Sequence, residues 1–382
     1  PHISSFKEYV MRKLVTIRQA DKVEHHPNAD ALDLVEIGGW TVITKRDEFK
    51  AGDLGVFLEI DSTVPVGLPH FEFLEKNARV HKLQDFYGVP FEFHGTRIKT
   101  MKLRGIVSQG LFLPLSVLIG GKINESNVGK IAQIWMDKEL DLSNMNMFNV
   151  VKYDKYIPVN GSGAPKGNFP WFIQKSDQER LANMKGRLVE WLDRDVEVTI
   201  KLDGSSMTVF DLGDPEKYGK VPQEDGHYLG ICSRNLELQT DQSSTFTTVL
   251  TDEQKANIRE LPFDVAFQGE LLNTNIQGNY EKVAVPEFHV YNVFVLDGAK
   301  CSVLNPITAK AICKDVGLKY VPVLFEGKLR DFADSFEKIK ELSDGPGMNE
   351  GVKREGIVVK ALDGDNYFSF KQISETYLLN EK

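Results

Sequence analysis

Two charged residues stand two positions apart in the segment Lys201-Leu202-Asp203-Gly204-Ser205. Residues 196–201 alternate as a β-strand, and residues two apart on a strand face the same side. Lys201 and Asp203 are therefore predicted to point into one site. A lysine amine becomes a nucleophile once it loses its proton, and Gly204 permits a tight turn and the close approach of a phosphate. The segment alone also fits a charged hairpin tip.

Further charged residues stand at the ends of apolar, strand-like runs later in the chain. Glu270 ends one such run, Glu355 begins another and Lys371 ends a third. Each of them alone fits a solvent-exposed strand end. Together with Lys201 and Asp203, they form a set of carboxylates and lysines at strand ends of one sheet that is harder to attribute to solvent exposure.

The surrounding segments predict an α+β domain dominated by antiparallel sheet. Residues 196–210 are predicted to form a hairpin. Further strands are predicted over residues 229–233, 265–271, 288–296, 356–360 and 367–371. A helix is expected over 176–193, because apolar residues recur there at three- and four-residue steps. Ser176 is its expected N-cap, and Glu179 completes a capping box. Further helices are expected near 307–315 and 330–342.

The first part of the chain carries short β-rich runs that predict a small barrel. The runs lie at residues 32–37, 40–44, 56–60, 91–99 and 105–113. Residues 115–170 are less regular, and the best linker candidate is the segment 160–170, which is rich in Gly and Pro.

Composition and charge exclude several protein classes. The chain has 382 residues, of which 41% are hydrophobic and 26% charged, which is typical of a globular protein. The net charge of −9 argues against a general nucleic-acid coat protein. We expect an intracellular protein without a membrane segment. No apolar run approaches the length of a transmembrane helix, the first ten residues lack a signal-peptide core, and the three cysteines give no disulfide framework.

The motifs, taken in order, resemble those of the covalent nucleotidyltransferase superfamily, in particular the ATP-dependent RNA ligases. The matching segments are Lys201-Leu-Asp203-Gly204-Ser, Ser233-Arg234-Asn235, Gln268-Gly269-Glu270, Phe288-His-Val-Tyr291-Asn-Val, Glu355-Gly356-Ile-Val-Val-Lys360 and Phe370-Lys371. Residues 102–114 and 171–180 are similar to one two-domain RNA ligase family. That resemblance implies an OB-like domain over 11–120, an irregular connection and linker over 121–170, and an adenylyltransferase domain over 171–382.

The resemblance implies a three-step adenylyl transfer. Lys201 attacks the α-phosphorus of ATP and expels pyrophosphate. The AMP then moves to a 5′-phosphate RNA end, and the 3′-OH of a second end attacks it and releases AMP. The implied cofactors are ATP and Mg²⁺ or Mn²⁺. The implied partner is RNA with 3′-OH and 5′-phosphate ends, of which a nicked duplex is one form, and we expect the enzyme to be a monomer.

The resemblance also implies a role for each site residue. The catalytic residues are Lys201, Lys371 and Arg234. The nucleotide-binding residues are Lys175, Lys201, Gly204, Arg234, Glu270, Tyr291, Lys360 and Lys371, with Tyr291 stacking on adenine. The metal ligands are Asp203, Glu270 and Glu355, which act through metal-bound waters.

Two positions depart from the family pattern. Ser369 stands where many relatives have a second lysine, and Asn292 stands where many have an acid. Two other features, a basic segment and a pair of histidines, can each be interpreted in two ways. The segment 97–104, with four cations and no acid, suits either an RNA-binding groove or a solvated strand edge. The His25-His26 pair suits a polar turn better than a metal site.

Two other functions remain open from the sequence alone. The chain could be a catalytically inactive RNA-binding protein of the same fold. It could also be a nucleotidyltransferase that uses another nucleotide or acceptor.

Overall fold

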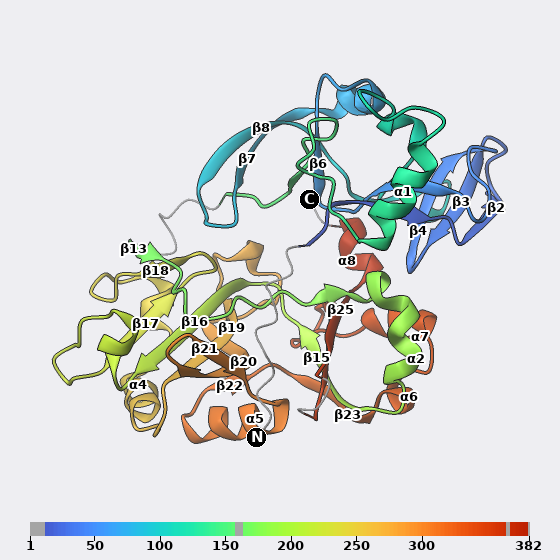
Figure 1. Ribbon diagram of the computed structural model, residues 1–382. Helices are drawn as coiled ribbons and strands as arrows, with labels where there is room; N and C mark the ends of the chain where they lie inside the picture. The colour runs from blue at the N-terminus through green and yellow to red at the C-terminus, as the bar shows by residue number, and fades with distance from the viewer. Residues whose placement is uncertain (1–11, 157–162, 364–366, 381–382) are drawn as a thin grey trace.

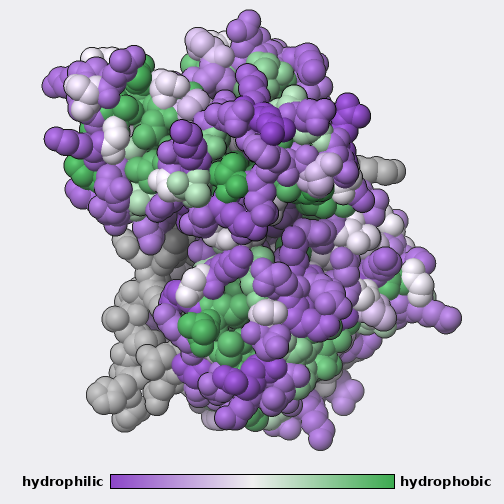
Figure 2. Space-filling view, turned by 90° about the vertical axis from the view of Figure 1, so that its right-hand side faces the viewer, coloured by the Kyte–Doolittle hydropathy of each residue, from purple (hydrophilic) through white to green (hydrophobic). Residues whose placement is uncertain are grey.

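The computed structural model of the chain describes residues 12–156, 163–363 and 367–380. They form two lobes, an N-terminal lobe of residues 12–156 and a C-terminal lobe that contains the remaining residues (Figure 1). The two lobes are also distinct in the space-filling view, where apolar side chains gather in small patches on a largely hydrophilic surface (Figure 2). The first eleven residues and positions 160–162 of the expected linker lie outside the described residues.

The N-terminal lobe is built from short antiparallel strands, as the β-rich runs predict. The strands are β1 (Val15–Gln19), β2 (Lys22–His25), β3 (Leu32–Ile37), β4 (Trp40–Lys45), β5 (Leu54–Leu58), β6 (Ser62–Pro65), β7 (Arg79–Gln84), β8 (Pro90–Arg97), β9 (Thr100–Leu103), β10 (Ile106–Gln109) and β11 (Leu111–Pro114). They pair as β1-β5-β11, β2-β3-β4, β9-β10 and β6-β8-β7. Short 3₁₀ helices, η1 (Pro69–Asn77) and η2 (Leu115–Leu118), complete this region.

The segment that follows the predicted barrel is more regular than expected. It contains helix α1 (Val128–Asp137) and strand β12 (Val151–Lys152), which pairs with β6. Ala132 of α1 packs with Leu142 and Phe148 into the core of the N-terminal lobe. The expected linker also contains strand β13 (Pro165–Asn168), which pairs with β18 of the C-terminal lobe. Most of the segment 121–170 is therefore packed on one lobe or the other.

The C-terminal lobe contains two sheets with flanking helices, which confirms the predicted α+β class. The larger sheet is ordered β13-β18-β17-β16-β19-β20-β21, with β22 pairing β20. Its further strands are β16 (Ser205–Leu212), β17 (Tyr228–Cys232), β18 (Leu236–Leu238), β19 (Val265–Leu272), β20 (Glu287–Asp297), β21 (Lys300–Val303) and β22 (Lys319–Tyr320). The smaller sheet consists of β14 (Glu179–Arg180), β25 (Ser369–Ile373), β24 (Gly356–Ala361), β15 (Asp195–Lys201) and β23 (Val323–Lys328), in that order.

The helices of the C-terminal lobe are short. They are α2 (Leu188–Trp191), α3 (Thr245–Thr248), α4 (Asp252–Arg259), α5 (Pro306–Asp315), α6 (Leu329–Phe332), α7 (Phe336–Ser343), α8 (Glu375–Asn380) and the 3₁₀ helices η4 (Leu181–Arg187), η5 (Pro215–Tyr218) and η6 (Gln277–Asn279). The helix predicted near 307–315 is α5. The helix predicted near 330–342 is divided into α6 and α7, because the chain leaves the helix at Ala333 and Ser335 caps the next one.

The predicted hairpin over residues 196–210 is wrong. Strand β15 pairs with β23 and β24, and strand β16 pairs with β17 and β19, so the two strands belong to different sheets. The link between them is partly apolar, since Leu202 is buried with Ile200 and Leu272. The chain thus passes from one sheet to the other at the Lys201-Leu202-Asp203-Gly204 segment, which places Lys201 where the two sheets meet (Figure 1).

The predicted helix over 176–193 is also largely wrong. Residues 179–180 form β14 beside β25, residues 181–187 form a 3₁₀ helix, and only Leu188–Trp191 is α-helical. Ser176 does not cap a helix, because its hydroxyl hydrogen-bonds the side chain of Gln268. The apolar spacing correctly indicates burial of Leu181 and Leu188, whereas pairing with β25 and the low helix propensity of Gly186 oppose a continuous α-helix.

The two lobes share one hydrophobic core. Trp40, Phe57 and Phe112 of the N-terminal lobe are in the same buried cluster as Trp191 and Phe370 of the C-terminal lobe. The backbone of the two lobes also makes contact, since the N–H of Gly39 donates to the carbonyl of Ala182 at 2.9 Å. A Cβ on Gly39 would lie 2.5 Å from Ala182 Cα, so only glycine permits this approach. The lobes are therefore packed as one body.

A buried group of arginines and carboxylates reinforces the contact between the lobes. Asp61 accepts hydrogen bonds from Arg97 at 2.5 Å, from Arg180 of the C-terminal lobe at 3.1 Å and from Arg12 at 3.4 Å. Burial raises the pKa of the Asp61 carboxyl, but the three guanidinium groups outweigh burial and hold this pKa well below its usual range. The carboxylate therefore stays ionised and neutralises arginines from both lobes.

We predict that Asp61→Asn lowers the free energy of unfolding at pH 7 by about 3–5 kcal/mol, because it removes the carboxylate that three buried guanidinium groups share and leaves Glu59 to pair with Arg12 and Arg180. Urea unfolding measures this change. The depressed pKa means that the contribution of Asp61 is present above its unfolded pKa and is lost as the pH falls toward the folded value. The matched control is Asp193→Asn, which removes an exposed pair with Arg330 and should change stability by less than about 1 kcal/mol. Equal losses in both variants would contradict this account.

Candidate active site

Lys201 ends strand β15, and its ammonium group forms an ion pair with Glu355. Lys201 Nζ lies 2.6 Å from Glu355 Oε2. Strand register explains the pair, because Lys201 lies opposite Gly356, the residue that follows Glu355. Both side chains are largely buried, with exposed side-chain fractions of 29% and 11%. The predicted nucleophile and a predicted metal ligand are therefore in direct contact.

The other two predicted carboxylates flank the link between the sheets. Glu270 lies on β19, and its Oε1 accepts the N–H of Gly204 at 3.2 Å. Asp203 Oδ2 accepts the hydroxyl of Tyr377 at 2.8 Å. A Cβ on Gly204 would lie 2.5 Å from the carbonyl oxygen of Leu271. Close packing of the link against β19, rather than a hairpin turn, therefore requires glycine at this position.

Glu281 is a fourth carboxylate at this link, and the sequence gives no sign of it. Its Oε1 accepts the N–H of Asp203 at 3.1 Å, while its Oε2 is buried without a hydrogen-bond partner. The residue is only 1% exposed. It follows the short η6 helix in a segment without strand or helix periodicity, so no pattern indicates its burial. Tyr377, from α8, is the second contributor that the sequence does not indicate.

The site holds more buried acidic groups than basic ones. Burial and the neighbouring carboxylates, against the opposing charge of Lys201, together raise the pKa of Glu270 to about 8 and that of Glu281 to about 7. Burial also raises the pKa of Glu355. For Lys201, burial lowers the pKa, but the charges of Glu355, Glu270 and Asp203 outweigh burial and raise it. The lysine is thus protonated, and the carboxylates favour an additional cation.

Within the described residues, no three or more His, Cys, Asp or Glu side chains are placed to coordinate one ion directly. The donor set is still suited to a divalent cation that keeps its waters, because Mg²⁺ commonly binds through water to carboxylates. The buried Glu281 Oε2, which has no partner, is the structural sign of such a site. Asp203, Glu270, Glu355 and Glu281 are the residues able to hold it.

A second cluster around Lys371 contains mainly cations. Lys371, on β25, forms a 2.5 Å ion pair with Asp177 Oδ1. Burial lowers the pKa of Lys371 to about 8, despite the opposing charge of Asp177. Lys152, from β12 of the N-terminal lobe, lies 3.9 Å from Asp177 Oδ2. The two lobes therefore contribute cations to one place.

Arg234 and Lys175 lie between this cluster and the other residues predicted to bind the nucleotide. Lys175 Nζ donates to Asn235 Oδ1 at 2.9 Å. Burial and the charge of Arg234 lower the pKa of Lys175 to about 8. The charge of Arg234 also acts on Glu270 and Tyr291. The charge of Arg234 is thus felt both at the carboxylate site and at Lys152 of the N-terminal lobe.

Lys360 of β24 contacts the part of β20 that carries Tyr291. The hydroxyl of Tyr291 hydrogen-bonds Ser206 and Ser176, and burial raises its pKa to about 12. Lys360 is 2% exposed, and its ammonium donates to the backbone carbonyl of Tyr291 and, at 2.9 Å, to Asn292 Oδ1. In this geometry Lys360 supports the strand that carries Tyr291. Asn292, which replaces an acid of many relatives, supplies a neutral acceptor.

The basic segment 97–104 does not act as one surface. Arg97 is engaged by Asp61 and lies over the ring of Tyr153 at 4.1 Å, so it belongs to the lobe contact. Lys102 and Arg104 are exposed. The His25-His26 segment has the geometry of a polar turn, since His26 Nε2 bonds the carbonyl of Leu103 at 3.2 Å and His25 Nδ1 bonds Asp33 at 2.8 Å.

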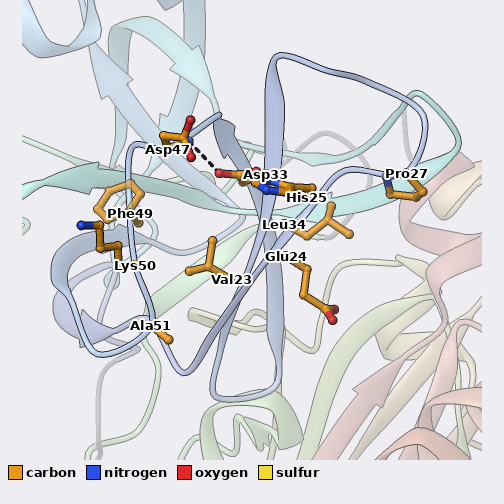
Figure 3. Close-up of a pocket in the computed structure, with 10 residues that line it drawn as sticks. All are labelled: Val23, Glu24, His25, Pro27, Asp33, Leu34, Asp47, Phe49, Lys50 and Ala51. Carbon is orange, nitrogen blue, oxygen red and sulfur yellow. Dashed lines mark hydrogen bonds and ion pairs between the residues drawn. The ribbon is translucent and has the colours of Figure 1, made fainter.

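A cavity of about 780 Å³ lies next to this turn in the N-terminal lobe. Val23, His25, Asp33 and Phe49 are among the side chains that line it (Figure 3). None of the predicted site residues lines this cavity. It is therefore separate from the site around Lys201.

Comparison with known proteins decides the family. An OB-fold domain family matches residues 14–115, and an RNA ligase family matches residues 194–373. A solved Naegleria gruberi RNA ligase mutant with ATP and Mn is 33% identical to this chain, with 97% of this chain and 99% of that chain covered and a TM-score of 0.77. The chain belongs to the RNA ligase family. The predicted OB-like N-terminal domain is also confirmed.

Two further Naegleria gruberi RNA ligase structures are similar to the same extent. A mutant with AMP and Mn is 34% identical, with 97% of this chain and 99% of that chain covered and a TM-score of 0.79. The ligase with PPi is 34% identical, with 96% and 98% covered and a TM-score of 0.77. A comparison with curated proteins finds no match. In the described part of this RNA ligase, no helix is long and apolar enough to cross a membrane.

We predict that Glu281→Gln stabilises the metal-free ligase at pH 8 but not at pH 5. Folding raises the pKa of Glu281. The protonated side chain therefore stabilises the folded state fully below the unfolded pKa, and this contribution is lost as the pH rises to about 7 and the carboxyl ionises. A neutral glutamine removes a penalty on the order of 3 kcal/mol above that pH. Thermal unfolding in a chelating buffer measures the difference. Exposed Glu224→Gln is the control. A pH-independent effect of Glu281→Gln would contradict the buried charge.

Proposed function

We propose that this RNA ligase joins RNA ends that carry a 3′-OH and a 5′-phosphate, through a lysyl-AMP and then an RNA-adenylate intermediate. The observation that carries the proposal is the largely buried Lys201–Glu355 ion pair of the smaller sheet, at the point where that sheet meets the larger one, with Asp203, Glu270 and Glu281 around it. ATP and Mg²⁺ or Mn²⁺ are the proposed cofactors, in line with the ATP, AMP and Mn of the similar Naegleria structures.

Lys201 Nζ is proposed to attack the α-phosphorus of ATP. A bond forms between Nζ and phosphorus, the bond to the β-phosphate bridging oxygen breaks, and pyrophosphate leaves. The amine must first lose a proton, and Glu355 Oε2, at 2.6 Å, is the nearest carboxylate oxygen to accept it. A hydrated divalent cation supplies positive charge that disfavours the protonated amine and offsets the negative charge of the phosphates.

Cations of the second cluster are proposed to neutralise the phosphates. Lys371 is paired with Asp177 in the free protein, and the α-phosphate of bound ATP would offer it a second anionic partner. Arg234 and Lys175 are proposed to contact the nucleotide beside it. Tyr291 is proposed to stack on adenine, with Lys360 holding its backbone in place. Because phosphoryl transfer depends mainly on positioning and charge, these roles account for most of the chemistry.

The later steps use the same site. The lysyl-AMP bond breaks when a 5′-phosphate oxygen of RNA attacks the AMP phosphorus, which restores the Lys201 amine. The 3′-OH of the second end then attacks the activated 5′-phosphate, and AMP leaves. In this proposal the enzyme is a monomer. Residues 11–120 form its OB-like domain, 121–170 its connection, and 171–382 its adenylyltransferase domain.

We predict that incubation with ATP and Mg²⁺ or Mn²⁺ adds the mass of one AMP to the protein, on Lys201. Intact-mass measurement followed by peptide mapping tests this, after any AMP already bound is removed. Lys201→Ala should lose the adduct without loss of folding, whereas Lys314→Ala, an exposed lysine of α5, should keep it. An adduct on the Lys201→Ala variant, or an adduct only with GTP, would contradict the proposal.

We also predict that Glu355→Ala slows metal-dependent adenylylation by roughly 10- to 100-fold, the usual effect of removing a group that orders metal-bound water. The variant should also bind Mn²⁺ more weakly. Isothermal titration with Mn²⁺ reports this loss independently of activity. Wild-type adenylylation in the variant would remove Glu355 from the proposed metal site.

A further inference from the structure

The hairpin of β7 and β8 ends in a rigid turn that carries exposed aromatic and apolar side chains. Tyr87 is 64% exposed and Val89 is 57% exposed. Asp85 Oδ1 accepts the backbone N–H groups of Tyr87 at 2.8 Å and of Val89 at 2.9 Å. Gly88 has a φ of +81°, a conformation that favours glycine. The backbone of the turn is thus fixed while the ring of Tyr87 faces solvent.

This turn reaches the C-terminal lobe beside the candidate active site. In Figure 1 the β7–β8 hairpin extends from the N-terminal lobe toward β13 and β18. The carbonyl of Phe86 accepts a hydrogen bond from Lys175 at 3.1 Å. Gly88 packs on Asn235, since a Cβ on Gly88 would lie 2.9 Å from Asn235 Cβ. The turn therefore contacts Lys175 and Asn235, the residue that follows Arg234.

The surroundings of the turn are rich in cations. Lys175 and Arg234 come from the C-terminal lobe, and Lys152 comes from β12. Burial and the charge of Arg234 lower the pKa values of Lys152 and Lys175, which indicates that these like charges lie close together. The acids near the turn are engaged, Asp85 by backbone N–H groups and Asp154 by Gln84 at 3.1 Å. A polyanion would relieve the repulsion among the cations.

We propose that the β7–β8 turn is a stacking platform for single-stranded RNA, on which Tyr87 stacks a base next to the 5′-phosphate that is to be adenylylated. Exposed aromatic rings beside cations that track the backbone are the general means of binding single strands. The phosphates of the strand would contact Lys152, next to Lys175 and Arg234 at the bound AMP. The inference rests on the proposed ligase function. It assigns to the N-terminal lobe the binding of the RNA strand that carries the 5′-phosphate.

Binding of a fluorescent, 5′-phosphorylated single-stranded oligoribonucleotide tests this platform by anisotropy. Tyr87→Ala should weaken binding by roughly 5- to 150-fold, the range of one lost base stack. Tyr87→Phe should bind like the wild type because it keeps the ring. The control is Phe73→Ala, which removes another exposed aromatic of the same lobe, from η1, and should bind RNA unchanged. Unchanged binding in Tyr87→Ala, or an equal loss in Phe73→Ala, would overturn the proposal.

Lysyl-AMP formation without RNA separates this inference from the proposed function. It should be unchanged in Tyr87→Ala, so an enzyme that forms the adduct but shows no Tyr87 effect on RNA binding contradicts the platform alone. An enzyme that forms no adduct contradicts the proposed function alone. Photo-crosslinking of wild-type protein to RNA that contains 5-iodouridine gives a second test without a variant. The adduct should map to the peptide that contains Tyr87, and adducts confined to other surfaces would overturn the platform.

Discussion

The ion pair between Lys201 and Glu355 is the interaction on which the rest of the site depends. A lysine amine at the junction of two sheets loses hydration, and the surrounding carboxylates compensate for that loss. Glu355 is placed by the start of β24 and Glu270 by β19, so each sheet supplies one of these carboxylates. The pair keeps the amine protonated in the free protein. Nucleophilic chemistry therefore requires that added positive charge weaken this pair.

The N-terminal lobe also helps to position the residues of this site. Arg180 lies opposite Lys371 in the pairing of β14 with β25, and its guanidinium group reaches Asp61 of the N-terminal lobe. Lys152 approaches Asp177, the partner of Lys371, from the same lobe. The position of Lys371 is thus linked to the N-terminal lobe by the pairing of β14 with β25 and by the ion pairs of Asp61 and Asp177, and the hydrophobic cluster that spans the lobes supports this arrangement. A substrate that bridges the lobes would contact both.

Much of this RNA ligase can be predicted from its sequence because the strongest signals are local. Strand runs with buried apolar residues predict β17, β19, β20, β24 and β25 to within two residues. Charged residues in or beside strand runs indicate Lys201, Glu270, Glu355 and Lys371. The predicted strand ends hold for Lys201 and Glu355, whereas Glu270 lies two residues before the end of β19 and Lys371 lies in the middle of β25. Periodicity cannot show the partner of a strand, which is why β15 and β16 seem to form a hairpin although each is paired on both sides within its own sheet.

Contacts that depend on tertiary packing are not visible in the sequence. Glu281 and Tyr377 come from short, irregular or terminal segments, and only folding brings them to Asp203. Asp177 stands where helix-capping chemistry is expected, but the pairing of β14 with β25 directs it to Lys371. The motif that contains Lys360 is recognisable in the sequence, whereas the burial of Lys360 against the backbone of Tyr291 is not.

The protonation state of Lys201 tests the central role of the ion pair most directly. Heteronuclear NMR of protein with selectively labelled lysine measures it, and the Lys201→Ala variant assigns the signal. In metal-free protein the Lys201 amine should stay protonated at pH values where free lysine begins to titrate. Addition of Mg²⁺ should lower its pKa. A Lys201 pKa that is at or below the usual value without metal, or that is unaffected by saturating Mg²⁺, would contradict the central role of the ion pair.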